Sequence, residues 1–436
     1  MSSKSPQLLK GFRDFGPDKM QTRLVLFAKI RSAFERFGFQ PMETPALEYT
    51  ETLSGKYGAE EKLMYRFKDN GGRSVAMRYD LTVPLARFYS SNKNILPKPF
   101  KRYAIGPVWR AENTQRGRFR EFYQCDVDIV GSTSAISDAE CVAVITEALT
   151  DMGVGDFAVR INNRKIIDGV LKFLNVPEKN FPAVLRALDK LDKQGEKKVR
   201  AELLEAGLKP DQTKKLFEYL AGSATNAKGL LDGFSEIVSE NKDLAEGVGE
   251  LSDVLDALAG LQVKNVTVDL KLARGLDYYT GTVCEVVLSR LPGLGSIAGG
   301  GRYDNLVGNV SGSKEIIPAV GMSIGIERLI EGLEELDILE YDSRSDILVF
   351  NLDGKLLPAY LNTVTALRKS GLNAELYFES SGMDKQFKYA EKKKINRAVI
   401  IGEEEIRSGQ AILKDLVTRK QKKIKIESLI KELKNI

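Results

Sequence analysis

A run of charged, aromatic and amide side chains in residues 100–129 carries the strongest chemical signal in this sequence. If residues 118–129 form a strand, side chains alternate between its faces, and one face is polar: Arg118, Arg120, Phe122, Gln124, Asp126 and Asp128. The other face suits a core: Phe119, Tyr123, Cys125, Val127 and Ile129. Arginines bind phosphate, an aromatic ring stacks on a base, and an amide with a carboxylate holds an ammonium or a ring N–H. The polar face therefore predicts the floor of a pocket for a nucleotide and a small amine.

This pattern has a structural alternative, because opposite charges on neighbouring strands also form cross-strand pairs. A surface hairpin stabilised by Arg–Asp pairs would use the same residues. The side-chain pattern alone leaves the pocket and the hairpin equally open.

A second segment with chemical potential covers residues 271–282, where Arg274, Tyr278 and Tyr279 lie among glycines. A strand end with aromatic packing explains these residues better when they are taken by themselves. The glycines of residues 299–301 match neither the P-loop nor the dinucleotide-binding pattern, so neither of those sites is indicated.

Two further segments combine a helix start with polar side chains. Residues 321–330 predict a glycine-containing strand that runs into a helix, where Arg328 either meets a nucleotide or pairs with a carboxylate. Upstream, Asp80 or Thr82 caps a helix whose first turn holds Pro84, and ligand binding is the second interpretation.

Several reaction classes are excluded by composition. The sequence contains no histidine, which excludes Ser-His-Asp and Cys-His catalysis and histidine-ligated metal sites. Its three cysteines are not spaced as C-x-x-C, so neither a zinc cluster nor a disulfide framework is supported and a reducing, cytosolic compartment fits. The N-terminus lacks an apolar signal region and no run of 18 apolar residues occurs, which predicts a protein that is neither secreted nor membrane-spanning.

The elements that must position these side chains fall into two or three domains, because 436 residues exceed a single core. Apolar spacing predicts an amphipathic helix over 17–37 that Gly38 ends, strand-like character over 40–137 and 264–316, and a helical insertion between them. A small α/β domain with a mixed sheet is predicted after residue 345, in the order strand 346–352, helix 356–370, strand 373–379, helix 383–394, strand 397–402, strand 410–417 and helix 426–435.

Positive charge is concentrated in this last domain. Residues 345–436 hold 18 Lys and Arg against 12 Asp and Glu, whereas the preceding 344 residues carry a net charge of −1. Lysine clusters attract a polyanion through counterion release, although a solvated surface is the simpler explanation of a net charge of +6.

Together and in order, these segments resemble the three signature motifs of class II aminoacyl-tRNA synthetases. Residues 38–48 resemble motif 1, the dimer-interface helix and strand; residues 108–112 with Arg118, Phe122 and Asp126 resemble motif 2; and residues 321–328 resemble motif 3. Residues 274–281 (Arg-Gly-Leu-Asp-Tyr-Tyr-Thr-Gly) closely resemble the histidine-specific motif of histidyl-tRNA synthetases, and residues 78–84 and 123–128 match the eukaryote-like form of that family. The similarity runs essentially end to end.

The resemblance implies a role for each matching residue. Arg110 would hold the ATP α-phosphate, Arg118 the outer phosphates, Phe122 and Arg328 the adenine ring, and Glu112 the adenine edge or the motif 2 loop. Arg274 would stabilise the charge that builds on the α-phosphate. The histidine substrate would be bound by Asp80, Leu81, Thr82, Gln124, Asp128, Tyr278 and Tyr279, with Asp128, where other members have Glu, accepting the imidazole N–H. Transfer RNA would meet Gln115, Arg116, Lys420 and Lys422.

The resemblance also implies the fold and the partners. It predicts an α+β class II catalytic domain of residues 1–177 and 263–337, an antiparallel sheet flanked by helices, with a helical insertion of residues 178–262. An anticodon-binding domain with a five-stranded mixed sheet would cover residues 345–436. The implied activity is cytoplasmic histidine–tRNA ligation by a homodimer that uses ATP, Mg²⁺ accompanying the ATP, L-histidine and tRNA(His), with no organic cofactor, zinc or membrane. The alternative is a regulatory paralogue of histidine biosynthesis without aminoacylation activity.

Overall fold

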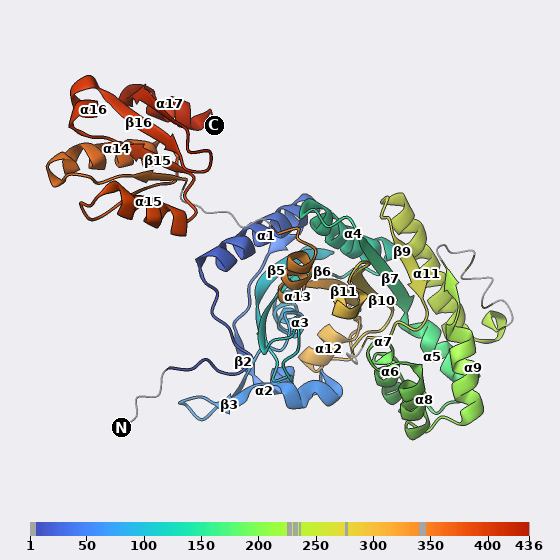
Figure 1. The fold of residues 1–436 in the computed structure, drawn as a ribbon. Coiled ribbons are helices and arrows are strands. Elements are labelled where there is room, and N and C mark those ends of the chain that lie inside the picture. The colour runs from blue at the N-terminus through green and yellow to red at the C-terminus, as the bar shows by residue number, and fades with distance from the viewer. Residues whose placement is uncertain are drawn as a thin grey trace. The chain divides into compact units, whose positions relative to one another are not determined.

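The structure, a computed structural model, describes residues 6–224, 237–274, 278–339 and 346–435, together with Gly229 and Phe234. The chain folds into two compact units (Figure 1). The first contains residues 26–339 and the N-terminal residues up to Asp14, and the second contains the C-terminal residues from Glu340 with Phe15–Val25.

The predicted N-terminal helix is confirmed as α1 (Pro17–Arg36). Its apolar positions Leu26, Ile30 and Phe34 are almost fully buried in the first unit, as their three- and four-residue spacing requires. Gly38 adopts a φ of 77°, a backbone conformation that favours glycine, and thereby ends the helix.

A nine-stranded sheet forms the centre of the first unit, in the order β1-β5-β6-β12-β11-β10-β7-β9-β8. The pairs β1–β5 and β7–β9 are parallel and the other pairs are antiparallel, so the predicted antiparallel sheet is confirmed with a parallel pair near each edge. Its strands are β1 (Gln40–Pro41), β5 (Phe100–Trp109), β6 (Glu121–Val130), β7 (Phe157–Asn163), β8 (Ser223–Ala224), β9 (Val266–Asp269), β10 (Thr282–Leu288), β11 (Ser296–Arg302) and β12 (Ala319–Gly325).

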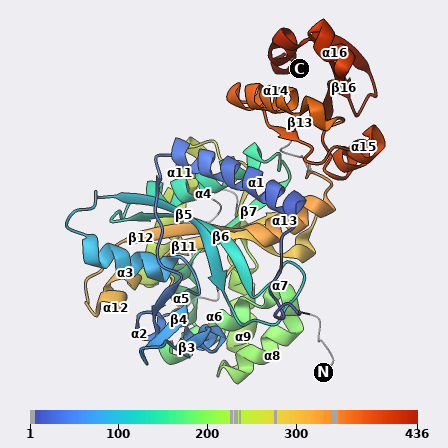
Figure 2. The ribbon, with the colours of Figure 1, turned by 90° about the vertical axis from the view of Figure 1, so that its left-hand side faces the viewer.

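Helices cover the apolar face of this sheet. The side chains of Cys125, Val127 and Ile129 on β6 enter the main core, as their alternation predicts, and α4 (Ala135–Asp151) packs over them. The same core takes in α5 (Arg164–Phe173) and α13 (Ile326–Glu335). A second core joins α3 (Thr82–Asn92) to α12 (Leu306–Ser311), which pack together at the left in Figure 2.

A small three-stranded sheet precedes α3 in the chain. It consists of β2 (Leu47–Tyr49), β4 (Ser74–Met77) and β3 (Arg66–Lys68) in that order, with α2 (Thr50–Leu53) and the 3-10 helix η1 (Gly58–Leu63) between β2 and β3. The stretch that reads as strand-like in the sequence thus alternates short strands with short helices.

The segment predicted as a helical insertion is helical over most of its described length. It contains η2 (Glu178–Asn180), α6 (Phe181–Leu188), α7 (Leu191–Gln194), α8 (Glu196–Glu205), α9 (Pro210–Leu220), η3 (Val238–Glu240) and α11 (Lys242–Gly260). The long helix α11 packs on α4 and α5, and so belongs to the layer that covers the large sheet.

The second unit contains the predicted five-stranded mixed sheet, in the order β14-β13-β15-β16-β17. Its strands are β13 (Ile347–Val349), β14 (Ala374–Leu376), β15 (Arg397–Ile400), β16 (Gln410–Asp415) and β17 (Gln421–Lys425), and its α-helices are α14 (Leu357–Lys369), α15 (Met383–Lys392), α16 (Glu403–Ser408) and α17 (Leu429–Lys434). The apolar pattern of the sequence missed α16 and the position of β17. Four of the five residues of β17 are exposed, so no apolar alternation marks it.

Candidate functional site

The polar face of β6 forms part of the wall of a cavity of about 1260 Å³. The other walls come from the connection between β5 and β6, from β10, β11 and β12, and from insertion residues 188–196. This geometry resolves the two interpretations of β6 in favour of the pocket.

Arg110 lies at the end of β5 and is aligned by two rings. Its Nε donates a hydrogen bond to the carbonyl oxygen of Tyr79 at 3.0 Å. Its guanidinium carbon lies 4.4 Å from the Tyr79 ring centre and 5.1 Å from that of Phe122, both distances at which a cation is attracted by a ring. Arg110 and Phe122 both line the cavity, which brings a cation and a stacking surface together.

The strand predicted over residues 118–129 begins only at Glu121, and this shifts two arginines. Arg118 lies in a tight turn opposite Gln115, lines the cavity and pairs with Glu112 at 3.1 Å. Arg120 was predicted on the pocket floor and this is wrong: its guanidinium donates to the carbonyl oxygens of Glu112 and Lys10. Strand alternation does not extend into the turn that precedes the strand.

Arg274 is half-buried beside Glu285 of β10, with 2.5 Å between Nη1 and Oε1. Burial acts to lower the pKa of Arg274, but the nearby Glu285, Tyr279 and Asp189 outweigh it and the pKa is raised. A Cβ on Gly299 would lie 2.4 Å from Nη1, so only glycine leaves room for this guanidinium. A fixed positive charge therefore faces the cavity.

Arg328, at the start of α13, completes a group of cations with Arg118 and Arg274. Its Nη1 donates to the carbonyl oxygen of Ser296. Burial, assisted by repulsion from Arg118 and Arg274, lowers the pKa of Arg328 to about 10. Three guanidinium groups converge here, and an anionic ligand would relieve their repulsion.

At the other end of the cavity, Asp80 precedes α3 and supports the predicted capping role. Its Oδ1 accepts hydrogen bonds from the backbone N–H of Thr82 at 3.2 Å and of Val83 at 2.9 Å, and from the hydroxyl of Tyr57 at 3.1 Å. Its buried Oδ2 has no hydrogen-bond partner within the described part of the chain. Burial raises the pKa of Asp80. One oxygen of this carboxylate is therefore available to accept a hydrogen bond from a ligand.

Gln124 and Asp126 repeat this pattern on β6. Gln124 donates from Nε2 to the hydroxyl of Ser323 at 2.9 Å, while its Oε1 is buried without a partner among the described residues. The Oδ1 of Asp126 is buried in the same way. Burial raises the pKa of Asp126 to about 7, with Arg102 opposing the shift and Asp128 adding to it. These two oxygens, together with Oδ2 of Asp80 and Oδ2 of Asp128, therefore line the cavity without a hydrogen-bond partner among the described residues, and a ligand with several N–H groups would satisfy them.

Asp128 also lines the cavity, and each of its oxygens has a close polar neighbour. Its Oδ2 lies 2.7 Å from Nη2 of Arg102, which is fully buried, and its Oδ1 accepts a hydrogen bond from the hydroxyl of Tyr303. A Cβ at Gly321 on β12 would lie 2.0 Å from Oδ1, so the strand can pass here only as glycine. Burial raises the pKa of Asp128, which Arg102 and the Tyr303 hydroxyl oppose.

The aromatic residues of the second segment join this end of the cavity. The rings of Tyr278 and Tyr279 lie 4.9 Å apart, and Tyr278 also lies 6.0 Å from Tyr303. All three line the cavity. Residues 275–277 of the same segment lie outside the described residues.

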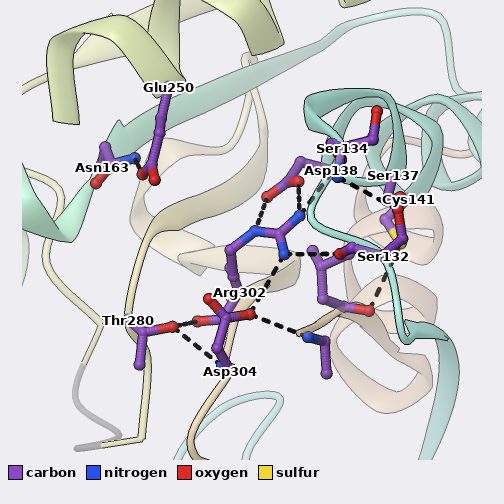
Figure 3. A network of polar contacts seen from close by, with 12 residues as sticks. Ser132, Ser134, Ser137, Asp138, Cys141, Asn163, Glu250, Thr280, Arg302 and Asp304 are labelled. Atoms are coloured by element: carbon purple, nitrogen blue, oxygen red, sulfur yellow. Dashed lines mark hydrogen bonds and ion pairs between the residues drawn. The ribbon is translucent and has the colours of Figure 1, made fainter. Parts of the chain in front are cut away.

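A network of polar contacts surrounds Arg302 at the end of β11, next to Tyr303 in the chain (Figure 3). The guanidinium of Arg302 pairs with Asp138 on α4 and with Asp304, and it donates to the carbonyl oxygens of Ser132 and Ser134. The backbone of Arg302 accepts the N–H of Thr280 at 2.8 Å. The segment that carries the two tyrosines is thereby tied to the strand that carries Tyr303.

The remaining predicted residues occupy mixed positions. Thr82 lines the cavity, whereas Leu81 is buried in a small apolar cluster beneath Phe122. Gln115 and Arg116 also line the cavity, but Arg116 is held by Glu331 at 2.9 Å and by Glu335. In the second unit, Lys422 pairs with Glu432, and Lys420 is exposed just before β17.

The sequence predicted no role for several residues that the structure places at the site: Arg102, Asp126, Glu285, Ser323 and Tyr303. Asp126 was on the predicted polar face, so its position was available from alternation. The others gave no local signal, because each acquires its contact only through strand pairing.

The chain is similar to known proteins along its whole length. Residues 11–329 match the family model described as histidyl-tRNA synthetase, and residues 346–436 match the anticodon binding domain. Histidine–tRNA ligase of Rhodopirellula baltica is 42% identical over 424 residues, which cover 96% of this chain and 95% of that protein. That of Clostridium tetani is 40% identical over 438 residues, covering 99% and 98%.

Solved structures give the same result. The crystal structure of histidyl-tRNA synthetase from Nostoc sp. PCC 7120 matches with a TM-score of 0.87 at 36% identity, covering 100% of this chain and 99% of that chain. An ATP phosphoribosyltransferase regulatory subunit/histidyl-tRNA synthetase from Bacillus halodurans C shares the fold, with a TM-score of 0.77 at 21% identity. None of the described helices is long and apolar enough to cross a membrane.

Proposed function

Because the chain belongs to the histidyl-tRNA synthetase family and is a histidine–tRNA ligase, we propose that the cavity lined by β6, β11 and β12 is where histidine is activated. The carrying observation is that one cavity is lined both by Arg110, Arg118, Arg274 and Arg328 and by buried oxygens without a hydrogen-bond partner among the described residues. ATP phosphates suit the arginines. The α-ammonium and imidazole N–H groups of histidine suit the free oxygens.

Activation is a displacement at phosphorus. A histidine carboxylate oxygen forms a bond to the α-phosphorus, the bond to the β-phosphate oxygen breaks, and pyrophosphate leaves. This step needs in-line positioning and stabilised phosphate charge but no proton transfer. The ribose hydroxyl at the tRNA 3′ end then attacks the adenylate carbonyl, and AMP leaves. Arginines that line the cavity supply the charge, which is consistent with a sequence that contains no histidine.

We give the arginines the roles that the resemblance to the family implies. Arg110 contacts the α-phosphate, Arg118 the outer phosphates, and Arg274 the oxygens on which charge accumulates. The adenine ring lies between Phe122 and Arg328. The partners that already hold Arg110 and Arg274 support the assignment, because a preorganised cation stabilises the transition state without rearranging.

The histidine end has its own assignments. Asp80 and Gln124 accept N–H groups of the α-ammonium, beside Thr82, and Tyr278 and Tyr279 surround the ring. The free Oδ2 of Asp80 and Oε1 of Gln124 support this role, since each lacks another partner in the described structure.

We assign Mg²⁺ to the nucleotide and not to a resident metal site. Among the described residues, no three acidic side chains form a group that could hold a metal ion, and Glu285 is engaged by Arg274. Phosphate oxygens and water suit Mg²⁺, which dehydrates reluctantly.

Transfer RNA would use Gln115, the exposed part of Arg116, and the lysine-rich β16–β17 region. A cytoplasmic place of action remains our proposal.

We further propose a homodimer, in which the small sheet β2-β4-β3 is part of the interface. Leu47, Tyr49 and Phe67 are 45%, 51% and 46% exposed on one face of this sheet, whose strand β2 overlaps the end of the segment that resembles motif 1. Light scattering is expected to give a dimer for the wild type and a monomer for Tyr49→Asp/Phe67→Asp. Ile95→Asp, which changes an exposed apolar residue outside this sheet, should remain dimeric.

Pyrophosphate exchange tests the activity. The wild type is expected to exchange pyrophosphate into ATP only when L-histidine is present, and to charge tRNA(His). No exchange, or exchange with another amino acid, would contradict the proposal and favour the regulatory paralogue.

A further inference from the structure

The N-terminal segment of residues 10–13 lies against the connection between β5 and β6, and the proposed function gives it no role. Arg120, at the end of that connection, donates its backbone N–H to the carbonyl oxygen of Gly11 at 2.9 Å. Its Nη1 donates to the carbonyl oxygen of Lys10 at 3.4 Å, and its Nε to that of Glu112 at 3.1 Å. The Arg120 side chain therefore joins the N-terminal segment to both ends of the connection.

Arg13 makes a second attachment to the same connection. Its guanidinium carbon lies 3.2 Å from the ring centre of Phe119, a cation–π contact. Its Nη2 lies 3.6 Å from Oε1 of Glu327, which is buried at the start of α13, and Oε2 of Glu327 accepts the N–H of Tyr123 on β6 at 2.9 Å. Water screens a pair with a buried carboxylate less than it screens an exposed pair. Arg13 thus fastens the connection to α13 and to the start of β6.

The N-terminal segment can approach the connection this closely only because residue 11 is glycine. Gly11 has a φ of 87°, in the region that favours glycine. A Cβ at this position would lie 2.7 Å from Cγ of Arg120 and 3.0 Å from Cγ2 of Thr114. The next residue, Phe12, packs edge-on against Tyr65 with 6.2 Å between the ring centres, which holds the segment from another side.

The other side of this connection faces the cavity. Arg118, to which we assign the outer phosphates of ATP, lines the cavity and pairs with Glu112 of the same connection. The position of Arg118 therefore depends on that of the whole connection. Ordering a loose connection when a ligand binds costs free energy and weakens binding. Contacts that order it beforehand remove this cost.

We propose that Gly11 and Arg13 are positioning residues for ATP: they hold the β5–β6 connection so that Arg118 is in place before the nucleotide binds. This inference rests on the proposed function of the cavity. It predicts an effect on ATP and not on histidine. The groups assigned to the histidine α-ammonium have other supports, since Asp80 is bound by the backbone of α3 and Gln124 by Ser323.

The first test measures both KM values of full-length Arg13→Ala in histidine-dependent pyrophosphate exchange. The KM for ATP is expected to rise about 5- to 30-fold, and the KM for histidine to stay within about twofold of the wild type. Arg13→Lys, which keeps the charge but not the planar group, should show a smaller rise. A variant that only folds less completely would lose kcat with both KM values unchanged, and that result, or equal rises in both, would overturn the inference.

The matched control is Arg200→Ala. Arg200 on α8 also lies over a phenylalanine, 4.2 Å from the ring centre of Phe217, and pairs with Glu196. It loses the same kinds of contact away from the β5–β6 connection, so both KM values should stay at those of the wild type.

Gly11→Ala probes the same attachment without changing a charge. The added methyl group displaces the N-terminal segment from Arg120, so the KM for ATP should again rise while that for histidine does not. Gly155→Ala is its control, because an added Cβ there has no atom of the described chain within 4 Å apart from its chain neighbours. Wild-type KM values for ATP in both Gly11→Ala and Arg13→Ala would overturn the inference.

A double variant tests whether Arg13 acts through Arg118. If it does, Arg13→Ala should raise the KM for ATP less than about twofold further in an Arg118→Ala background, because residues that act as a unit are not additive. A full additional rise would overturn the inference, as would a wild-type KM for ATP in Arg118→Ala alone. A wild type without histidine-dependent exchange would instead overturn the proposed function itself.

Discussion

At the scale of single residues, the cavity is built from charges that the protein holds in place before any ligand binds. Arg274 is fixed by Glu285, and the glycine at position 299 leaves room for it. Such a cation stabilises charge that develops in the transition state more than charge already present in the bound substrate. Loss of the Arg274 charge should therefore slow the chemical step more than it weakens substrate binding.

Arg274→Ala is predicted to lower adenylate formation about 10²- to 10³-fold, by analogy with the loss of other preorganised groups that stabilise developing charge. Binding of histidine, measured by calorimetry, should change less than threefold, roughly the scale of a weak contact. Arg274→Lys should recover part of the activity, since it restores charge but not the planar guanidinium. Equal losses of binding and chemistry would show that Arg274 is structural.

Asp126 makes the stability of the ligand-free enzyme depend on pH. Burial raises its pKa to about 7, whereas an unfolded Asp has a pKa of about 3.9. A group whose pKa is raised on folding contributes stability that is lost as the pH rises through the folded value. Asp126→Asn lacks this titration, so the wild type should lose stability relative to it between about pH 4 and pH 7.

Urea unfolding of the ligand-free proteins measures this effect. The stability difference in favour of Asp126→Asn is expected to be about 2–4 kcal/mol larger at pH 8 than at pH 4. A difference that does not change with pH would contradict the prediction.

At the scale of elements, β11 connects the core to the histidine end of the cavity. Its three successive glycines allow close approach: a Cβ at Gly300 would lie 2.0 Å from the carbonyl oxygen of Gly321. At its end, Arg302 reaches α4 while the next residue, Tyr303, reaches Asp128 on β6. Two adjacent residues at the end of β11 therefore contact both α4 and a carboxylate of β6 that lines the cavity.

Arg302→Met is predicted to destabilise the protein by about 3–5 kcal/mol, because it leaves Asp138 buried without its cation. Arg164→Met, which breaks a more exposed pair with Asp168, should cost at most about 1 kcal/mol. Chemical unfolding of both variants gives the comparison. Similar losses for the two would show that burial of the Arg302 pair is unimportant.

At the scale of the whole molecule, the candidate site and the excess positive charge lie in different units of the chain. The first unit holds the cavity, and the net charge of +6 lies in residues 345–436. Many lysines of the second unit have carboxylate partners, among them Lys422 with Glu432, Lys423 with Glu405 and Lys393 with Glu375. Paired lysines release fewer counterions to a polyanion than free ones.

Lys420 and Lys422 allow this idea to be tested. Lys420→Ala is expected to reduce the slope of log affinity for tRNA(His) against log salt concentration by about 1, if Lys420 contacts a phosphate. Lys422→Ala should change the slope less, because Glu432 already neutralises it. Filter binding between low and physiological salt measures both slopes, and unchanged slopes in both variants would remove this face from the tRNA interface.

Local sequence was sufficient for the family, the activity and many of the helices and strands, because motifs and periodicity are local properties. The polar face of β6, the cap at Asp80 and the helix α1 all follow from residues within a few positions of each other. Predictions from local patterns were wrong at two places. Arg120 does not point to the pocket floor, because the strand begins only at Glu121, and β17 was missed because it lacks apolar alternation.

Only the tertiary structure decided which polar groups are already satisfied. Asp126 and Asp128 have the same residue type and the same face, and no local rule distinguishes them. The difference comes from Tyr303, 175 residues away, and from Arg102 on the neighbouring strand: both contact Asp128, whereas Asp126 forms no ion pair with any described residue. A hydrogen bond depends on distances of about 3 Å between atoms brought together by folding, and spacing along the chain does not encode them.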